Sequence, residues 1–182
     1  HEGNRLLFEQ MKLFPDRILG WASLHSTRFG REALDELERC RNDYGMRGLK
    51  IYSTPDMSIA EPAMIPILEK CVELDFPILG HTTPQECEYL LGYVPECKLI
   101  MAHAGGQPFA KGDWNRAIMS AQRFENLYLD TASSTIDCGF LEACVAAIGP
   151  ERIIFGTDTP LLDPWAQLAK IRETNLPQQD LE

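Results

Sequence analysis

Short apolar runs alternate with amphipathic stretches along most of this 182-residue chain. Three of the runs lead into a polar residue: residues 76–81 end in His81, residues 98–106 contain His103 followed by two glycines, and residues 152–158 end in Asp158. Short apolar runs bounded by turn residues are typical of strands buried in a parallel sheet. The pattern therefore predicts three strands whose ends carry potentially reactive side chains.

Other stretches predict helices. The clearest is 62–74, where Met64, Ile67, Leu68 and Cys71 recur at helical spacing over a polar face. Residues 83–86 read Thr-Pro-Gln-Glu, a capping box that starts a helix within one turn of His81. Further helices are predicted over 4–12, over 31–44 with Gly45 as a left-handed stop, around 114–121, around 141–148, and after the Asp163 cap.

Additional strands are predicted over 17–24, 46–52 and 126–132, which makes six strands, each followed by a helix. Such alternation predicts an α/β fold with a parallel sheet, either open and doubly wound or closed into a barrel. An eight-unit barrel takes about 250 residues. By length alone, an open sheet is the better interpretation.

Composition narrows the class of protein. The chain is 45% hydrophobic and 24% charged, which favours a single globular domain over residues 1–182. A formal charge of -10 argues against nucleic acid or an anionic membrane as a partner, and no apolar run has the length of a membrane span. The six cysteines form no CxxC pair, so we expect reduced core thiols in a cytoplasmic protein.

The strand-end residues suggest metal chemistry. Imidazole and carboxylate groups bind zinc, manganese or iron, so His81, His103 and Asp158 are expected to form one polar site. A metal there would acidify a bound water, and Asp158 could transfer the proton. Taken singly, each residue has a plainer interpretation, since strand-end histidines are commonly structural and Asp-Thr-Pro commonly forms a turn. Three of them at corresponding positions favour the shared site.

Lys50 occupies the equivalent place on another strand, and it could be a carbamylated metal bridge, an anchor for a substrate carboxylate, or a solvated lysine. The anchor or the structural role suits its position best. Asp130 also ends a strand and could line the same mouth, whereas His25 is a weaker candidate. Gly105-Gly106 is not a dinucleotide fingerprint, and no Gly-x-Ser-x-Gly motif is present, which argues against a nucleotide site and a serine nucleophile.

Taken together, residues 47–51, 77–82, 100–106, 127–130 and 152–160 follow in the order seen in the amidohydrolase superfamily. They most resemble its amidohydrolase-related branch, which includes the aminocarboxymuconate-semialdehyde decarboxylase group. The resemblance implies a (β/α)8 TIM barrel with one divalent metal ion. It implies that His81 and Asp158 are metal ligands, and that His103 orients or deprotonates a metal-bound water.

The chain departs from this family in one respect. The family takes two further ligands from a His-x-His on its first strand. The histidines of this chain are His1, His25, His81 and His103, so the sequence contains no such pair. The six predicted strands correspond to the third through the eighth, so the barrel is expected to be incomplete. The chain starts with His1 rather than Met, which favours a fragment of a longer protein over a short relative. Unpaired strand edges would favour a homodimer.

We therefore expect a metal-dependent hydrolase that acts on a small carboxylated or cyclic amide-like molecule through a metal-activated water, with zinc as the preferred ion. A metal-dependent non-oxidative decarboxylase is the close alternative. A catalytically silent barrel piece with a binding or assembly role is the alternative from another class.

Overall fold

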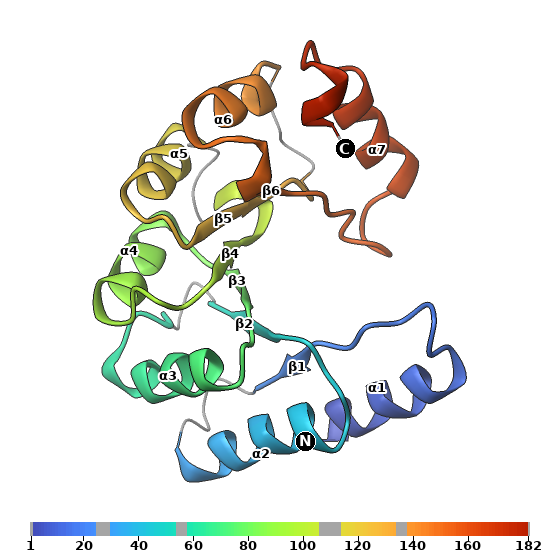
Figure 1. Ribbon diagram of the computed structural model, residues 1–182, viewed down its shortest axis with the longest axis vertical. Coiled ribbons are helices and arrows are strands. Elements are labelled where there is room, and N and C mark those ends of the chain that lie inside the picture. Colours follow the sequence, from blue (N-terminus) through green and yellow to red (C-terminus); the bar gives the residue numbers. More distant parts are fainter. Residues whose placement is uncertain (1, 25–29, 54–57, 106–113, 134–137, 182) are drawn as a thin grey trace.

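The computed structural model describes residues 2–24, 30–53, 58–105, 114–133 and 138–181, and six strands in these ranges form one sheet of order β1-β2-β3-β4-β5-β6. All neighbouring strands are parallel. Each strand lies beside the next one in sequence, which is the order of a (β/α)8 barrel, whereas the order of a doubly wound sheet reverses at a switch point. The expected barrel-type fold with six βα units is confirmed, and Figure 1 shows these units as an arc.

The helices and strands follow the sequence pattern closely. They are α1 (Glu2–Leu13), β1 (Ala22–Ser23), α2 (Arg31–Asn42), β2 (Leu49–Tyr52), α3 (Ile65–Glu73), β3 (Ile78–His81), α4 (Pro84–Tyr93), β4 (Leu99–Met101), α5 (Trp114–Arg123), β5 (Leu127–Asp130), α6 (Phe140–Ile148), β6 (Ile153–Ile154) and α7 (Pro164–Arg172). Short 3-10 turns cover Pro62–Met64, Ala102–Gly105, Pro150–Arg152 and Gln178–Asp180.

The two outermost strands are shorter than predicted. The strand expected over 17–24 is reduced to Ala22–Ser23, and the one expected over 152–158 to Ile153–Ile154. In the described ranges, β1 and β6 each pair with one neighbour only, so fewer ladder hydrogen bonds hold their backbone extended. As a consequence, Asp158 lies in irregular chain beyond β6 rather than at a strand end.

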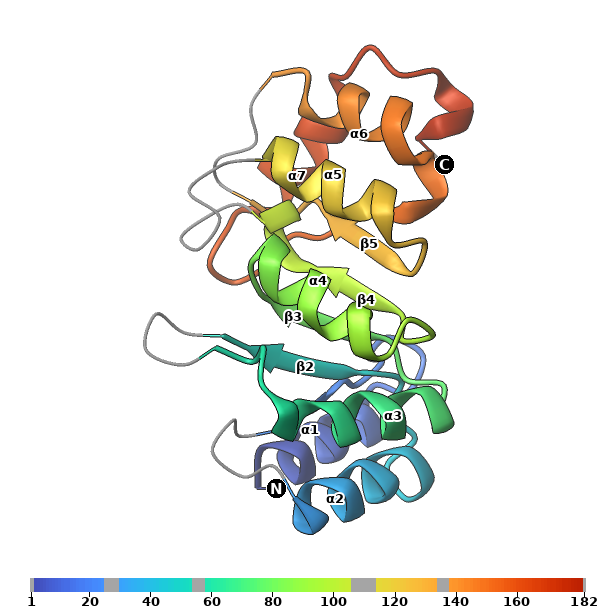
Figure 2. The same cartoon turned by 90° about the vertical axis from the view of Figure 1, so that its left-hand side faces the viewer.

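The two faces of the sheet differ in chemistry. One face is apolar, and its fully buried layer consists of Leu49, Ile78, Leu99 and Leu127, which are in register across four strands. Helices α3, α4, α5 and α6 lie along this face of the sheet (Figures 1 and 2). The residues between these positions point to the opposite, inward face, because side chains alternate along a strand. That inward face carries the polar residues of interest.

A side-chain amide covers the outer edge of β1. Asn4 of α1 accepts a hydrogen bond from the Ser23 backbone N–H at 2.8 Å and donates to the Ser23 carbonyl oxygen at 3.1 Å. Its Nδ2 also donates to Glu36 at 2.9 Å, and both side chains are buried. The backbone groups of Ser23 are thus paired within the chain, while the homodimer stays a prediction.

The sequence also predicted reduced, buried cysteines and no membrane-spanning segment. All six cysteines are free; five are buried as expected, whereas Cys138 is exposed. No helix in the described ranges combines the length and the apolar character needed to cross a bilayer.

Candidate functional site

The register of β2, β3 and β5 gathers polar side chains at one edge of the sheet. Tyr52 is paired with His81, and both end their strands. Asp130 ends β5 in the same way. Lys50 precedes Tyr52 by two residues and therefore points to the same inward face. The carboxyl ends of parallel strands in barrel-type folds are where ligands bind, so this edge is the candidate site.

Aromatic and imidazole rings form a continuous row there. The rings of His81 and His103 meet edge to face, with centroids 5.0 Å apart and an interplanar angle of 84°. Tyr52 lies on the other side of His81 at 5.8 Å, and the Lys50 ammonium lies 4.7 Å from the centre of the Tyr52 ring. The structure thus brings together Lys50, His81 and His103.

His81 is held in its neutral form. Burial lowers the pKa of His81 to about 4, and the neighbouring His103 and Lys50 act in the same direction. A hydrogen bond between the His81 side chain and the backbone of Ser53 acts in the opposite direction but does not outweigh them. A neutral imidazole whose second nitrogen is fixed by a backbone group is the form that binds metal ions.

The position of His103 is fixed in a different way from that of His81. It follows β4 in a left-handed turn, with φ 59° and ψ 20° at His103 and φ 47° and ψ 39° at Ala104. Left-handed backbone costs about 1–2 kcal/mol for a residue other than glycine, so this turn requires support from elsewhere. Asp130 supplies it: one carboxylate oxygen accepts the backbone N–H of His103 at 3.4 Å and that of Ala132 at 2.8 Å.

Charged groups of both signs lie near His81 and His103. Burial lowers the pKa of Lys50, whereas Asp130 and Asp158 act to raise it. Burial raises the pKa of Asp130, while the hydrogen bonds from Ala132 and His103 and the charges of His103 and Lys50 act to lower it. These five residues, Lys50, His81, His103, Asp130 and Asp158, are called the mouth cluster below.

Asp158 belongs to the mouth cluster through its charge. Its carboxylate influences both His81 and Lys50 electrostatically. Its backbone is left-handed, with φ 54°, and its carbonyl accepts the N–H of Leu161 at 2.9 Å. Among the residues that the structure describes, no three His, Cys, Asp or Glu side chains are grouped so that they could hold a metal ion. The mouth cluster therefore fits a divalent ion in its donor chemistry but supplies only part of a ligand set.

Several features of the site were not predicted. Tyr52 was missed, although its spacing of two residues from Lys50 was a usable signal. The position of Asp130 in the mouth is as expected, but its hydrogen bond to His103 has no signal in the sequence. His25 lies outside the described residues.

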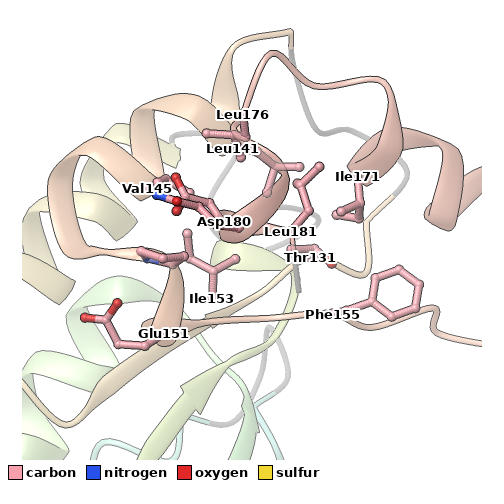
Figure 3. Close-up of a pocket in the computed structure, with 12 residues that line it drawn as sticks. Thr131, Leu141, Val145, Glu151, Ile153, Phe155, Ile171, Leu176, Asp180 and Leu181 are labelled. Carbon is pink, nitrogen blue, oxygen red and sulfur yellow. The ribbon is translucent and has the colours of Figure 1, made fainter.

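A pocket of about 470 Å³ lies elsewhere in the molecule, beside β6, α6 and the C-terminal residues (Figure 3). Its described lining includes Leu141, Ile153, Phe155 and Ile171 and contains no histidine or lysine. None of the five mouth-cluster residues defined above lines this pocket.

The sequence of the whole described region matches a known family. The family model for amidohydrolases matches residues 2–182. The chain belongs to the amidohydrolase family. The resemblance inferred from the strand-end motifs is therefore confirmed, and with it the superfamily assignment.

Solved structures support the fold of this amidohydrolase. A 2,6-dihydroxybenzoate decarboxylase from Rhizobium has a TM-score of 0.80 at 20% identity, over 99% of this chain and 72% of the other. For an amidohydrolase-like protein from Staphylococcus aureus the TM-score is 0.79 at 18% identity, with coverages of 100% and 75%. A dihydroxybenzoic acid decarboxylase from Polaromonas, solved with bound manganese, has a TM-score of 0.77 at 21% identity, with coverages of 99% and 70%.

Proposed function

We propose that the mouth cluster is the reactive part of a metal-dependent enzyme that removes a carboxylate from a small aromatic or unsaturated acid without oxidation. The observation that carries this proposal is the pairing of His81 with His103 at 5.0 Å, beside Lys50, at the carboxyl edge of the sheet. In support, two solved structures of similar fold are decarboxylases of hydroxylated benzoates.

The proposed roles follow from the surroundings of each side chain. His81, neutral and fixed, is proposed as a metal ligand together with Asp158. A divalent ion held there would polarise a substrate carboxylate or carbonyl and acidify a bound water. Lys50 is proposed as the anchor for a substrate carboxylate, because its ammonium lies on the inward face beside Tyr52.

His103 is proposed as the residue that transfers a proton. Its Nδ1 faces the carbonyl oxygen of Ala132, and a carbonyl can only accept, so Nδ1 carries a hydrogen and Nε2 is the atom that exchanges a proton. In decarboxylation, a proton is added to the carbon that bears the carboxylate, the carbon–carboxylate bond breaks, and carbon dioxide leaves. His103 Nε2 would exchange the proton that this step requires.

Hydrolysis of a small carboxylated or cyclic amide-like molecule is the second candidate. The same neutral His81 and exchangeable Nε2 of His103 suit attack by an activated water, and the family is that of amidohydrolases. The reactions differ in product, since hydrolysis adds water and decarboxylation releases carbon dioxide.

The first test is metal content and turnover of the protein made from its complete reading frame. Zinc and manganese are each supplied, metal is measured by plasma mass spectrometry, and carbon dioxide release from 2,6-dihydroxybenzoate is followed. About one metal ion per chain, lost in both His81→Ala and Asp158→Ala, is expected. Full occupancy in both variants would overturn the ligand assignment, and a metal-free, inactive protein would favour the binding or assembly role.

A matched pair of lysines tests the anchor. Lys50 lies on β2 at the mouth, whereas Lys98 precedes β4 at the opposite edge and forms an exposed ion pair with Asp75 at 3.1 Å. Lys50→Met is expected to raise KM by at least about tenfold, since hydrogen bonds to a charged group contribute about 1.5–3 kcal/mol. Lys98→Met should leave KM unchanged; equal effects of the two variants would remove Lys50 from the site.

A further inference from the structure

Asp130, which supports the left-handed turn at His103, is the most buried charged residue of the mouth cluster. It is 8% exposed, and its neighbours from other elements include Lys50 of β2, Lys170 of α7 and the turn at His103. Attraction to a nearby lysine alone seldom offsets the free energy that a buried carboxylate loses with its solvation. Further hydrogen bonds to the carboxylate are therefore expected. Its hydrogen bonds indicate what it does.

One oxygen of Asp130 holds two separate backbone segments together. Oδ1 accepts from the N–H of His103 on one segment and from the N–H of Ala132 on the other. His103 is 27 residues away from Asp130 in sequence, so this link joins β5 to the turn that follows β4. The turn and residue 132 are thereby fixed relative to each other.

That link also determines the state of the His103 ring. The carbonyl of Ala132, whose N–H is held by Asp130, is the group that faces Nδ1 of His103. A carbonyl can accept only, so the ring must carry its hydrogen on Nδ1. The other carboxylate oxygen of Asp130 lies against the chain after β6, since a Cβ added to Gly156 would clash with Oδ2.

We infer that Asp130 is a positioning residue that acts through the Ala132 backbone to hold His103 as the Nδ1–H tautomer, with Nε2 free to exchange a proton. Its charge is secondary in this role, and its acceptor oxygen is essential. The part of the inference that concerns turnover rests on the proposed function, whereas the tautomer is a property of the protein alone.

The tautomer can be read directly from the nitrogen resonances of the imidazole ring in mildly alkaline solution. The chain has four histidines, and His103 is assigned by its loss in His103→Gln. The wild type is expected to show the Nδ1–H form. Asp130→Ala should convert His103 to a mixture of both forms, and Asp130→Asn, which keeps an acceptor oxygen, should restore the single form.

Two further variants guard against a general loss of structure. Gly156→Ala crowds the Asp130 carboxylate without removing it and should disturb the tautomer in the same direction. Asp163→Ala removes another aspartate that accepts a backbone N–H, that of Ala166 at 2.9 Å, and should leave His103 unchanged. A single Nδ1–H form in Asp130→Ala, or a mixture in Asp163→Ala, would overturn the inference.

Turnover gives a second readout. Residues that orient a metal ligand typically change activity by about 10- to 100-fold, and we expect a similar factor for one that orients a proton-transfer residue. In the complete enzyme, Asp130→Ala should lower kcat by that factor with little change in KM, and Asp130→Asn should recover most of the loss. A tautomer change without any loss of kcat would keep Asp130 as the residue that positions His103 but would contradict the proposed role of His103 in proton transfer.

Discussion

The ends of β3 and β4 lie side by side, and each presents a histidine to the mouth, yet the two are built differently. β3 runs straight into His81, and α4 begins three residues later with a capping box. β4 ends two residues before His103, which lies in a left-handed turn held by Asp130 of β5. The first histidine is placed mainly by its own segment, and the second by a distant one. Equal motifs in sequence therefore need not give equal roles.

The largest expected effect separates the two histidines by role. His81→Ala should abolish both metal binding and turnover, because it removes a proposed ligand. His103→Ala should retain the metal but lower turnover by about 10²- to 10⁴-fold, the usual contribution of a proton-transfer residue. Metal content and carbon dioxide release are measured on the same preparations. Loss of metal in His103→Ala, or metal retention in His81→Ala, would show that the roles are not divided in this way.

The next effect concerns the buried hydrogen-bond centre behind His81. Glu86 accepts hydrogen bonds from the hydroxyls of Ser53 at 2.5 Å and Ser58 at 2.6 Å and from the Thr83 N–H at 2.8 Å. Glu86→Ala leaves these donors unsatisfied and should lower the free energy of unfolding by about 2–4 kcal/mol. Urea denaturation of the variant and the wild type measures the difference; a change below about 1 kcal/mol would contradict the assigned network.

The same carboxylate predicts a pH dependence. Burial acts to raise the pKa of Glu86, but hydrogen bonds from Ser53, Ser58 and Thr83 outweigh it and hold the pKa below the ordinary 4.5. A group whose folded pKa is lowered binds protons more readily when unfolded, so its stabilisation is present above pH 4.5 and is lost as the pH falls below it. Glu86→Gln should flatten the stability profile in that acidic range, and an unchanged slope would count against the lowered pKa.

Packing behind β3 gives a smaller effect. A Cβ at Gly80 would lie 2.6 Å from Cγ2 of Thr82, a buried side chain that contacts Cys87 Sγ at 3.0 Å. Gly80→Ala should therefore cost about 1–3 kcal/mol by overpacking. Gly92 of α4 has nothing within 4 Å of the added atom, so Gly92→Ala is the matched control and should stabilise by about 0.5–1 kcal/mol. Equal thermal shifts for both variants would refute the crowding argument.

The contrast between the two strand ends also explains what the sequence could predict. The capping box at Thr83, the Asp163 cap and the left-handed Gly45, with φ 66°, all depend on neighbours within a few residues, and all are confirmed. The left-handed backbone at His103 was not foreseen, because its support comes from Asp130, 27 residues away in sequence, and this conformation is uncommon for any residue other than glycine.

The predicted lengths of the two outermost strands, β1 and β6, were wrong for a related reason. Apolar patterning marks where a strand can lie, but the number of paired residues depends on the neighbouring strand, and β1 and β6 have one such neighbour in the described ranges. The inward pair of Lys50 and Tyr52 depends on the period of two along β2, a local property, and could have been predicted.

The smallest expected effect tests how local the β3 end is. Thr83 Oγ1 accepts the N–H of Glu86 at 3.2 Å, so Thr83→Ala removes one half of the capping box and should cost about 1 kcal/mol. Thr83→Ser keeps the hydroxyl and is the control. Because the β4 end depends on Asp130 instead, the imidazole nitrogen resonances of His103 should be the same in Thr83→Ala as in the wild type. A change of the His103 tautomer in this variant would mean that the two strand ends are coupled, and the division between a locally built and a distantly held histidine would have to be abandoned.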